Sequence, residues 1–289
     1  MDGLMLRSTE DYTLNIQWFP GHMAKTRRIM SESLKLVDAV CEVLDARAPF
    51  STQNPEIDLI LKNKPRLIVL NKCDLADESA TKIWHEKLKQ SGKVLAVDCK
   101  TGRNINKFLP EVRDLLKEKI ERSIARGMKN KKLRVMVVGI TNVGKSTLIN
   151  RLGKMGTRVK AENRPGVTRG NQWINCKDVE LLDTPGILWP KFEDVLVAQN
   201  LAFLGSIKDQ VLDIESLALR LISVLRQINP TLITNRYNVE NLNDDLAVLE
   251  SISKIRGFKI RGGDFDTERA SVALLDEFRS GVLGRITLE

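Results

Sequence analysis

Residues 133–147 read LRVMVVGITNVGKST, and this stretch decides how the rest of the chain is interpreted. The apolar residues Leu133–Val138 predict a buried β-strand. Next comes the run Gly139-Ile-Thr-Asn-Val-Gly144-Lys145-Ser146, whose spacing is typical of a loop that binds phosphate groups. Residues 147–152 then predict the start of a helix, and a strand–loop–helix context is what such a loop requires.

This loop predicts a phosphate site for physical reasons. Glycines let the backbone turn its N–H groups toward phosphate oxygens, and the helix N-terminus adds a partial positive charge. Lys145 supplies a full charge to the outer phosphates, and the Ser146 hydroxyl can ligate Mg²⁺. The neighbouring residues expected to contact the nucleotide are Thr141, Asn142, Val143, Gly144 and Thr147.

Composition limits the class of protein. The 289 residues are 42% hydrophobic and 29% charged, which is typical of a soluble globular chain of one large or two medium domains. No run of 18 or more apolar residues and no signal-peptide core occur, so we expect a cytoplasmic protein with no membrane partner. Four cysteines without a CxxC pair, and only two histidines, argue against a zinc site or a disulfide framework.

The net charge of +9 favours a polyanionic partner, of which nucleic acid is the commonest. A generally basic, solvated surface is the alternative. Two sets of basic residues are candidates for phosphate contact, one on an amphipathic helix near the start of the chain and one near its end. They are Lys25, Arg27 and Arg28, and Lys254, Arg256, Lys259 and Arg261.

Apolar runs alternate with helical patterns along most of the chain. This alternation predicts an α/β fold with a doubly wound, mostly parallel sheet, in which ligands bind at the carboxyl ends of the strands. The expected strands are 36–45, 66–70, 93–97, 133–138, 173–176 and 179–182. The expected helices between them are 57–61, 79–90 and 105–124.

Helical patterns alone follow residue 193. They predict two domains, one of residues 1–193 that begins with a basic segment 1–35, and an all-helical domain of residues 194–289. That the second domain binds RNA is an expectation from the family resemblance described below. The helices expected in the second domain are 195–204, 209–228, 244–256 and 267–282.

A guanine-reading motif, Asn71-Lys72-Cys73-Asp74, follows the second expected strand. The Asp74 carboxylate can accept hydrogen bonds from both the ring N–H and the amine of guanine, and adenine would leave it unsatisfied. Asn71 is expected to tie the neighbouring loops together, and the Lys72 stem to lie against the base. After the third strand, Cys99 and Lys100 occupy a base-contacting turn, where the Cys99 N–H should face the guanine oxygen.

A second phosphate motif, Asp183-Thr-Pro-Gly186, follows the last expected strand. Its carboxylate is suited to hold Mg²⁺ through water, and the Gly186 N–H can reach a terminal phosphate. Thr168, in the long polar loop of residues 154–171, is the expected second hydroxyl ligand of Mg²⁺, although it could be an ordinary loop threonine.

Together these motifs are the parts of a GTPase, but the base-reading motifs come before the phosphate motifs. A circular permutation preserves such a site because it only moves the chain ends on the surface. In this order, the Asp183–Gly186 loop leads through residues 187–193 directly into the helical domain. Phosphate-dependent ordering of that loop could therefore move the helices.

The sequence resembles the circularly permuted GTPases, and among them the ribosome biogenesis GTPase A (YlqF-type) family, over nearly its full length. The residues that carry the resemblance are WFPGHMAK from Trp18, DARAP from Asp45, NKCD from Asn71, GITNVGKST from Gly139, RPGVTRG from Arg164, DTPGILWPK from Asp183 and GRITLE from Gly284. The resemblance implies binding of GTP and GDP, with Mg²⁺, and assembly of the large ribosomal subunit. Its precursor, rRNA and ribosomal proteins are the implied partners, and the free protein is expected to be a monomer.

Catalysis is expected to depend on groups outside the two phosphate motifs. Ile187 stands where small signalling GTPases place a water-orienting glutamine, and an apolar side chain cannot orient water. The resemblance points instead to His22, and it suggests that Asn142 helps to hold K⁺ beside the phosphates. Lys145, Thr168 and Gly186 complete the expected catalytic set.

Two other functions remain open from the sequence. A small-molecule or nucleoside kinase shares the phosphate loop, but the guanine-reading motif argues against it. A GTP-controlled scaffold for a non-ribosomal partner would use the same motifs without a ribosomal role.

Overall fold

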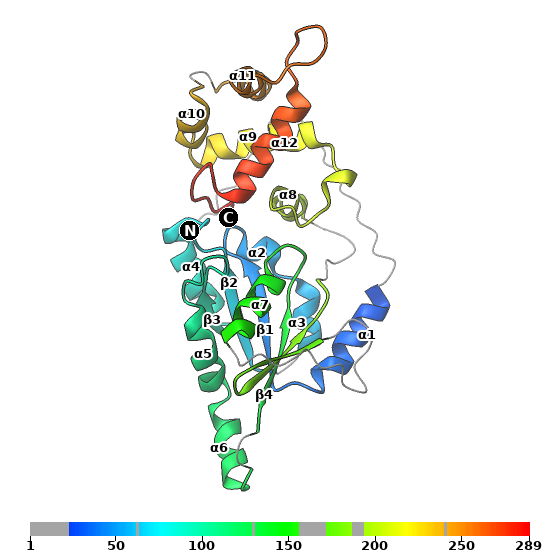
Figure 1. Ribbon diagram of the computed structural model, residues 1–289, viewed down its shortest axis with the longest axis vertical. Helices are drawn as coiled ribbons and strands as arrows, with labels where there is room; N and C mark the ends of the chain where they lie inside the picture. Colours follow the sequence, from blue (N-terminus) through cyan, green and yellow to red (C-terminus); the bar gives the residue numbers. More distant parts are fainter. Residues whose placement is uncertain (1–22, 62–63, 129–130, 156–171, 187–193, 240–241) are drawn as a thin grey trace.

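One six-stranded sheet organises the computed structural model, which describes all residues except 1–22, 62–63, 129–130, 156–171, 187–193 and 240–241 (Figure 1). The strands lie in the order β3-β2-β1-β4-β6-β5, and only β5 pairs antiparallel. Their bounds are β1 (Ala39–Asp45), β2 (Arg66–Asn71), β3 (Lys93–Ala96), β4 (Leu133–Val138), β5 (Gln172–Cys176) and β6 (Val179–Asp183). The predicted doubly wound, mostly parallel sheet is confirmed.

Alternating side chains of each strand face two different helix layers, because successive residues of a strand point to opposite faces. From β1, Cys41 and Val43 join the cluster that includes α5 (Phe108–Leu115) and α7 (Lys145–Met155). Val40 packs on the other face, in the cluster of α1 (Met23–Leu34) and α3 (Pro55–Leu61). Leu44 lies on that same face, with α4 (Glu78–Leu88). Both faces are therefore buried, as near-continuous apolar strands require.

Several expected segments differ from the structure. The helix expected over 105–124 is divided into η1 (Ile105–Lys107), α5 and α6 (Lys117–Ala125), because Leu116 leaves helical geometry at φ −107° and ψ 15°. A short helix, α2 (Pro49–Thr52), lies between β1 and α3, where no helix was expected. Proline at a first helical position explains it, since its fixed φ suits the helix and its missing N–H costs nothing there.

Helices make up the described regular structure after residue 193, and they lie together above the sheet in Figure 1. They are α8 (Val195–Phe203), η2 (Asp209–Val211), α9 (Ile214–Ile228), α10 (Thr231–Tyr237), α11 (Asp245–Arg256) and α12 (Thr267–Ser280). Four of them start at an aspartate whose side chain accepts a backbone N–H of the first turn, which is a preferred cap. These caps are Asp194, Asp213, Asp244 and Asp266. Helix α10 was not among the expected helices, and Pro230 lies at its N-terminus. The helix expected over 209–228 is divided into η2 and α9, because Leu212 is extended at φ −116° and ψ 147°.

The helical part contacts the sheet part in two places that matter for the site. Helix α8 packs on α2, and the last residues of the chain return from α12 toward α2 and α4 (Figure 1). The predicted domain boundary at 193/194 adjoins residues outside the described set and remains a prediction. Among the described residues, no helix has the length and apolar character needed to cross a membrane.

Candidate nucleotide-binding site

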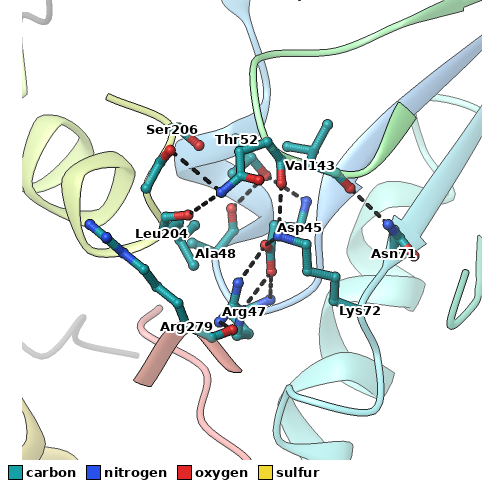
Figure 2. Close-up of polar contacts among 12 residues, drawn as sticks. Asp45, Arg47, Ala48, Thr52, Asn71, Lys72, Val143, Leu204, Ser206 and Arg279 are labelled. Atoms are coloured by element: carbon teal, nitrogen blue, oxygen red, sulfur yellow. Dashed lines mark hydrogen bonds and ion pairs between the residues drawn. The ribbon is translucent and has the colours of Figure 1, made fainter. Parts of the chain in front are cut away.

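Asn71, at the end of β2, joins three loops at the carboxyl edge of the sheet. Its amide donates to the Val143 carbonyl at 2.8 Å (Figure 2), and its carbonyl oxygen accepts the Cys99 N–H at 3.1 Å. Gly144 has φ +95°, and a Cβ there would lie 2.2 Å from the Asn71 Nδ2 atom, so this approach requires glycine. The expected role of Asn71 as the tie between loops is confirmed.

The N–H of Cys99 has a hydrogen-bond partner within the protein. That N–H is occupied by Asn71, and the Lys100 N–H donates to Asp98 Oδ1 at 2.7 Å. The tie between loops uses this donor here, and the expectation that the Cys99 N–H faces a guanine oxygen stays a prediction. Burial raises the pKa of the Cys99 thiol to about 12, so this thiol stays neutral.

Asp74 lies half-buried in the turn after Asn71 and Lys72. Among the described residues, none donates a hydrogen bond to its carboxylate. An ionised carboxylate accepts two or more hydrogen bonds, so this group has capacity for the two donors of a guanine edge.

Lys72 bridges the guanine-reading loop and the phosphate loop. It adopts φ +59°, its Nζ atom donates to the Asn142 carbonyl at 2.7 Å, and the same Nζ lies 2.8 Å from Asp45 Oδ2. Its side chain therefore spans the two loops, and its place against the base stays a prediction.

Asp45 and Arg47 form a buried ion pair beneath this bridge (Figure 2). Arg47 Nε and Nη2 donate to the two Asp45 oxygens at 3.0 and 2.9 Å, and both side chains are about 1% exposed. Burial opposes ionisation of Asp45, but the charges of Arg47 and Lys72 outweigh it and hold the pKa of this carboxyl well below its ordinary value. The remaining guanidinium donor reaches the Arg279 carbonyl, at the end of α12, at 3.1 Å.

Lys145 begins α7 and is 8% exposed. Its Nζ donates to the Ile140 carbonyl at 2.8 Å, and burial lowers its pKa to about 8, although nearby Asp183 opposes that shift. Burial likewise raises the pKa of Asp183, which Lys145 partly offsets. A Cβ on Gly186 would lie 2.8 Å from the Lys145 Nζ atom, so the second phosphate motif meets the first at this lysine.

The remaining predicted residues divide into two groups. Ser146 and Thr147 are exposed in the first turn of α7, and Asp183 is half-buried at the end of β6. Hydroxyl and carboxylate oxygens are the ligands that Mg²⁺ prefers, so this donor set fits that ion. His22, Thr168 and Ile187 lie outside the described residues.

The sequence did not indicate that the phosphate loop is held from the helical part. Thr141 and Ser206 exchange hydrogen bonds between side chain and carbonyl in both directions, at 2.5 and 3.1 Å. The Asn142 amide donates to the Leu204 carbonyl at 2.9 Å. No local pattern signals these contacts, because their partners lie more than 60 residues away in a loop without a motif.

Comparison with known proteins decides the family. Residues 134–251 match the family of 50S ribosome-binding GTPases. The ribosome biogenesis GTPase A of Bacillus licheniformis is 45% identical over 277 residues, covering 95% of this chain and 98% of that protein. This chain belongs to the ribosome biogenesis GTPase A family. The GNP-bound YlqF structure from T. maritima aligns with a TM-score of 0.64 at 30% identity, covering 92% of this chain and 97% of that one.

Members and relatives of the ribosome biogenesis GTPase A family extend beyond bacteria. The mouse mitochondrial ribosome-associated GTPase 1 is 35% identical over 295 residues, covering 94% of this chain and 90% of that protein. The YlqF match confirms the circularly permuted GTPase fold, and the sequence resemblance stated above is confirmed with it.

Proposed function

We propose that this chain hydrolyses GTP to GDP and phosphate as an assembly factor of the large ribosomal subunit. The observation that carries the chemistry is the junction at Asn71, where the guanine-reading loop and the phosphate loop are tied by hydrogen bonds. The names of the relatives, which are ribosome biogenesis and 50S-binding GTPases, support the biological setting.

The base and the phosphates are bound by different residues in this proposal. Asp74 accepts hydrogen bonds from guanine, Asn71 holds its loop, and Lys72 lies along the base. Lys145 exchanges the Ile140 carbonyl for the outer phosphates, which a buried ammonium binds strongly. The Gly186 N–H, which lies near that ammonium, meets the terminal phosphate.

Ser146 and Thr168 are the proposed direct ligands of Mg²⁺, and Asp183 holds the ion through water. The bound ion would neutralise charge on the terminal phosphates. Partial burial raises the pKa of Asp183, and a bound cation would favour its ionised form.

Hydrolysis by the free protein should be slow, because Ile187 cannot orient water. His22 is the proposed activating residue, brought to the terminal phosphate when the ribosomal precursor orders the N-terminal segment. If His22→Ala leaves the turnover stimulated by large subunits unchanged, this role is excluded.

Asn142 is the proposed K⁺-binding residue of the phosphate loop. Its amide nitrogen bonds to Leu204, which orients the side chain and reserves its carbonyl oxygen for other partners. Hydrolysis should be faster in KCl than in NaCl at equal ionic strength, and equal rates would remove the K⁺ role.

The proposed RNA patch consists of exposed cations on and after α11. Among the described residues, Lys254, Lys259 and Arg261 have no carboxylate partner, whereas Arg256 is paired with Glu277. We therefore assign phosphate contact chiefly to the first three. We also propose that the protein contacts ribosomal proteins, lies in the cytoplasm and is a monomer when free.

The decisive experiment measures GTP hydrolysis with and without purified large ribosomal subunits at constant K⁺ and Mg²⁺, with small subunits as the control. We expect stimulation of about tenfold or more by large subunits alone. Slow turnover that neither subunit changes would leave the alternative, a GTP-controlled scaffold for a non-ribosomal partner.

A further inference from the structure

Residues 281–289, here called the strap, return from α12 and lie along the guanine-reading loop. The Ile286 N–H donates to the Leu75 carbonyl at 2.9 Å, and the Asp77 N–H donates to the Thr287 hydroxyl at 3.1 Å. Arg285 Nε donates to the Ala76 carbonyl at 2.7 Å. These bonds involve three consecutive residues that directly follow Asp74.

Packing supports these bonds. Ile286 is 2% exposed, and Gly281 has φ +81°. A Cβ on Gly281 would lie 2.5 Å from the Leu75 Cδ2 atom, so the strap and the loop are in close contact. The loop after Asp74 is therefore enclosed by residues more than 200 positions away.

The far end of the strap is also held. The Glu289 side chain accepts the Ser51 N–H at 2.9 Å and its hydroxyl at 2.7 Å, and the Trp84 indole donates to the Glu289 carbonyl at 3.0 Å. The Leu288 N–H donates to the Arg47 carbonyl at 2.8 Å. Contacts with α2 on one side and α4 on the other fix the course of the strap between them.

We propose that the strap is part of the guanine-recognition site, with Arg285 as a positioning residue that sets the carboxylate of Asp74. The proposal rests on the guanine-binding role of Asp74. Discrimination between bases requires the carboxylate to meet two donors at hydrogen-bond distance, and a displacement of about 1 Å weakens such recognition strongly. Arg285 bonds both flanks of Asp74, since its second donor lies 3.3 Å from the Cys73 carbonyl.

Arg285 is suited to a test because its removal should not unfold the chain. Its side chain is 43% exposed, and its nearest carboxylate, on Glu78, is 3.6 Å away and 60% exposed. Water can therefore solvate the Glu78 carboxylate that Arg285→Ala would leave, so no buried charge is created and the loss falls on loop geometry.

The experiment measures dissociation constants of fluorescent GDP and IDP by titration of the full chain. Inosine lacks the amine that Asp74 accepts in guanine, but it keeps the ring N–H and the phosphates. For Arg285→Ala we expect GDP affinity to fall by about tenfold and IDP affinity by no more than about threefold, because the lost bond is charge-assisted. Arg285→Lys, which keeps one donor, should restore part of the GDP preference.

Two further variants separate the explanations. Asp74→Ala should abolish the preference for GDP over IDP, and Arg236→Ala, which breaks a partly exposed pair with Glu277, should change neither constant. Equal losses of GDP and IDP in Arg285→Ala would overturn the positioning role, since general damage to the fold affects both. If Asp74→Ala itself kept the preference, the proposed guanine site would fail, and the strap proposal with it.

Discussion

The guanine-reading loop and the phosphate loop are both held from the helical part of the molecule, but by different attachments. In the first loop, the backbone groups after Asp74 bond to the strap, which follows α12. In the second, Thr141 and Asn142 bond to residues 204–206, which follow α8. Base recognition and phosphate binding therefore depend on two separate supports, the strap for the first loop and residues 204–206 for the second. A substitution in one support can affect its own loop without the other.

The two supports meet at Arg279, near the end of α12. Its guanidinium donates to the Phe203 and Ala202 carbonyls, at 3.0 Å each, and pairs with Asp209. Its own carbonyl accepts from Arg47, which reaches Lys72 through Asp45. A substitution at this meeting point should affect both loops, unlike substitutions within one support.

Arg47→Met has the largest expected effect. It leaves Asp45 buried with only Lys72 as a charged partner, so the free energy of unfolding should fall by about 3 kcal/mol. Urea denaturation measures this, and Arg236→Met, at an ion pair that is more exposed than that of Arg47 and Asp45, should cost less. Equal costs at the two arginines would show that the buried pair does not join the two supports.

Lys145→Ala tests the phosphate side alone. Loss of the ammonium should weaken binding of GDP and IDP alike, by about 100-fold, because it removes charge-assisted bonds to phosphate. Titration with both nucleotides checks this. The ratio of the GDP and IDP dissociation constants should be the same as in the unchanged protein. A changed ratio would contradict the independence of base recognition from phosphate binding.

The affinity for GDP should depend on pH through Lys145. Its pKa in the free protein is about 8, and only the protonated amine binds phosphate, so affinity should be constant below that pH and fall above it. The decline in GDP affinity approaches about tenfold per pH unit, because bound phosphate raises the pKa of Lys145 and keeps it protonated in the complex. Titrations from about pH 7 to 9 measure it. Lys145→Arg, whose guanidinium stays charged, should remove the decline.

Ser206→Ala has the smallest expected effect. It removes one hydrogen bond to the Thr141 carbonyl, so stability should fall by about 1 kcal/mol in thermal or urea unfolding. The preference for GDP over IDP should not change, in contrast to Arg285→Ala. A lost preference in Ser206→Ala would mean that the two supports are one unit.

The sequence by itself determined the strands, because near-continuous apolar runs are typical of a sheet buried on both faces. It also determined which loops meet, since the carboxyl ends of parallel strands share one edge. The role of Asn71 followed from this, because one amide can both donate and accept between neighbouring loops.

Only the tertiary structure decided how these loops are held. Arg47 contacts α12 across 231 residues, and Arg285 contacts Ala76 across 209, at positions where neither partner belongs to a nucleotide-binding motif. Tertiary structure also decided the hydrogen-bond partner of the Cys99 N–H, because that partner depends on how two loops pack. Such contacts use backbone carbonyls and N–H groups, which every residue carries, so their pairing leaves no pattern in the sequence and is decided by packing.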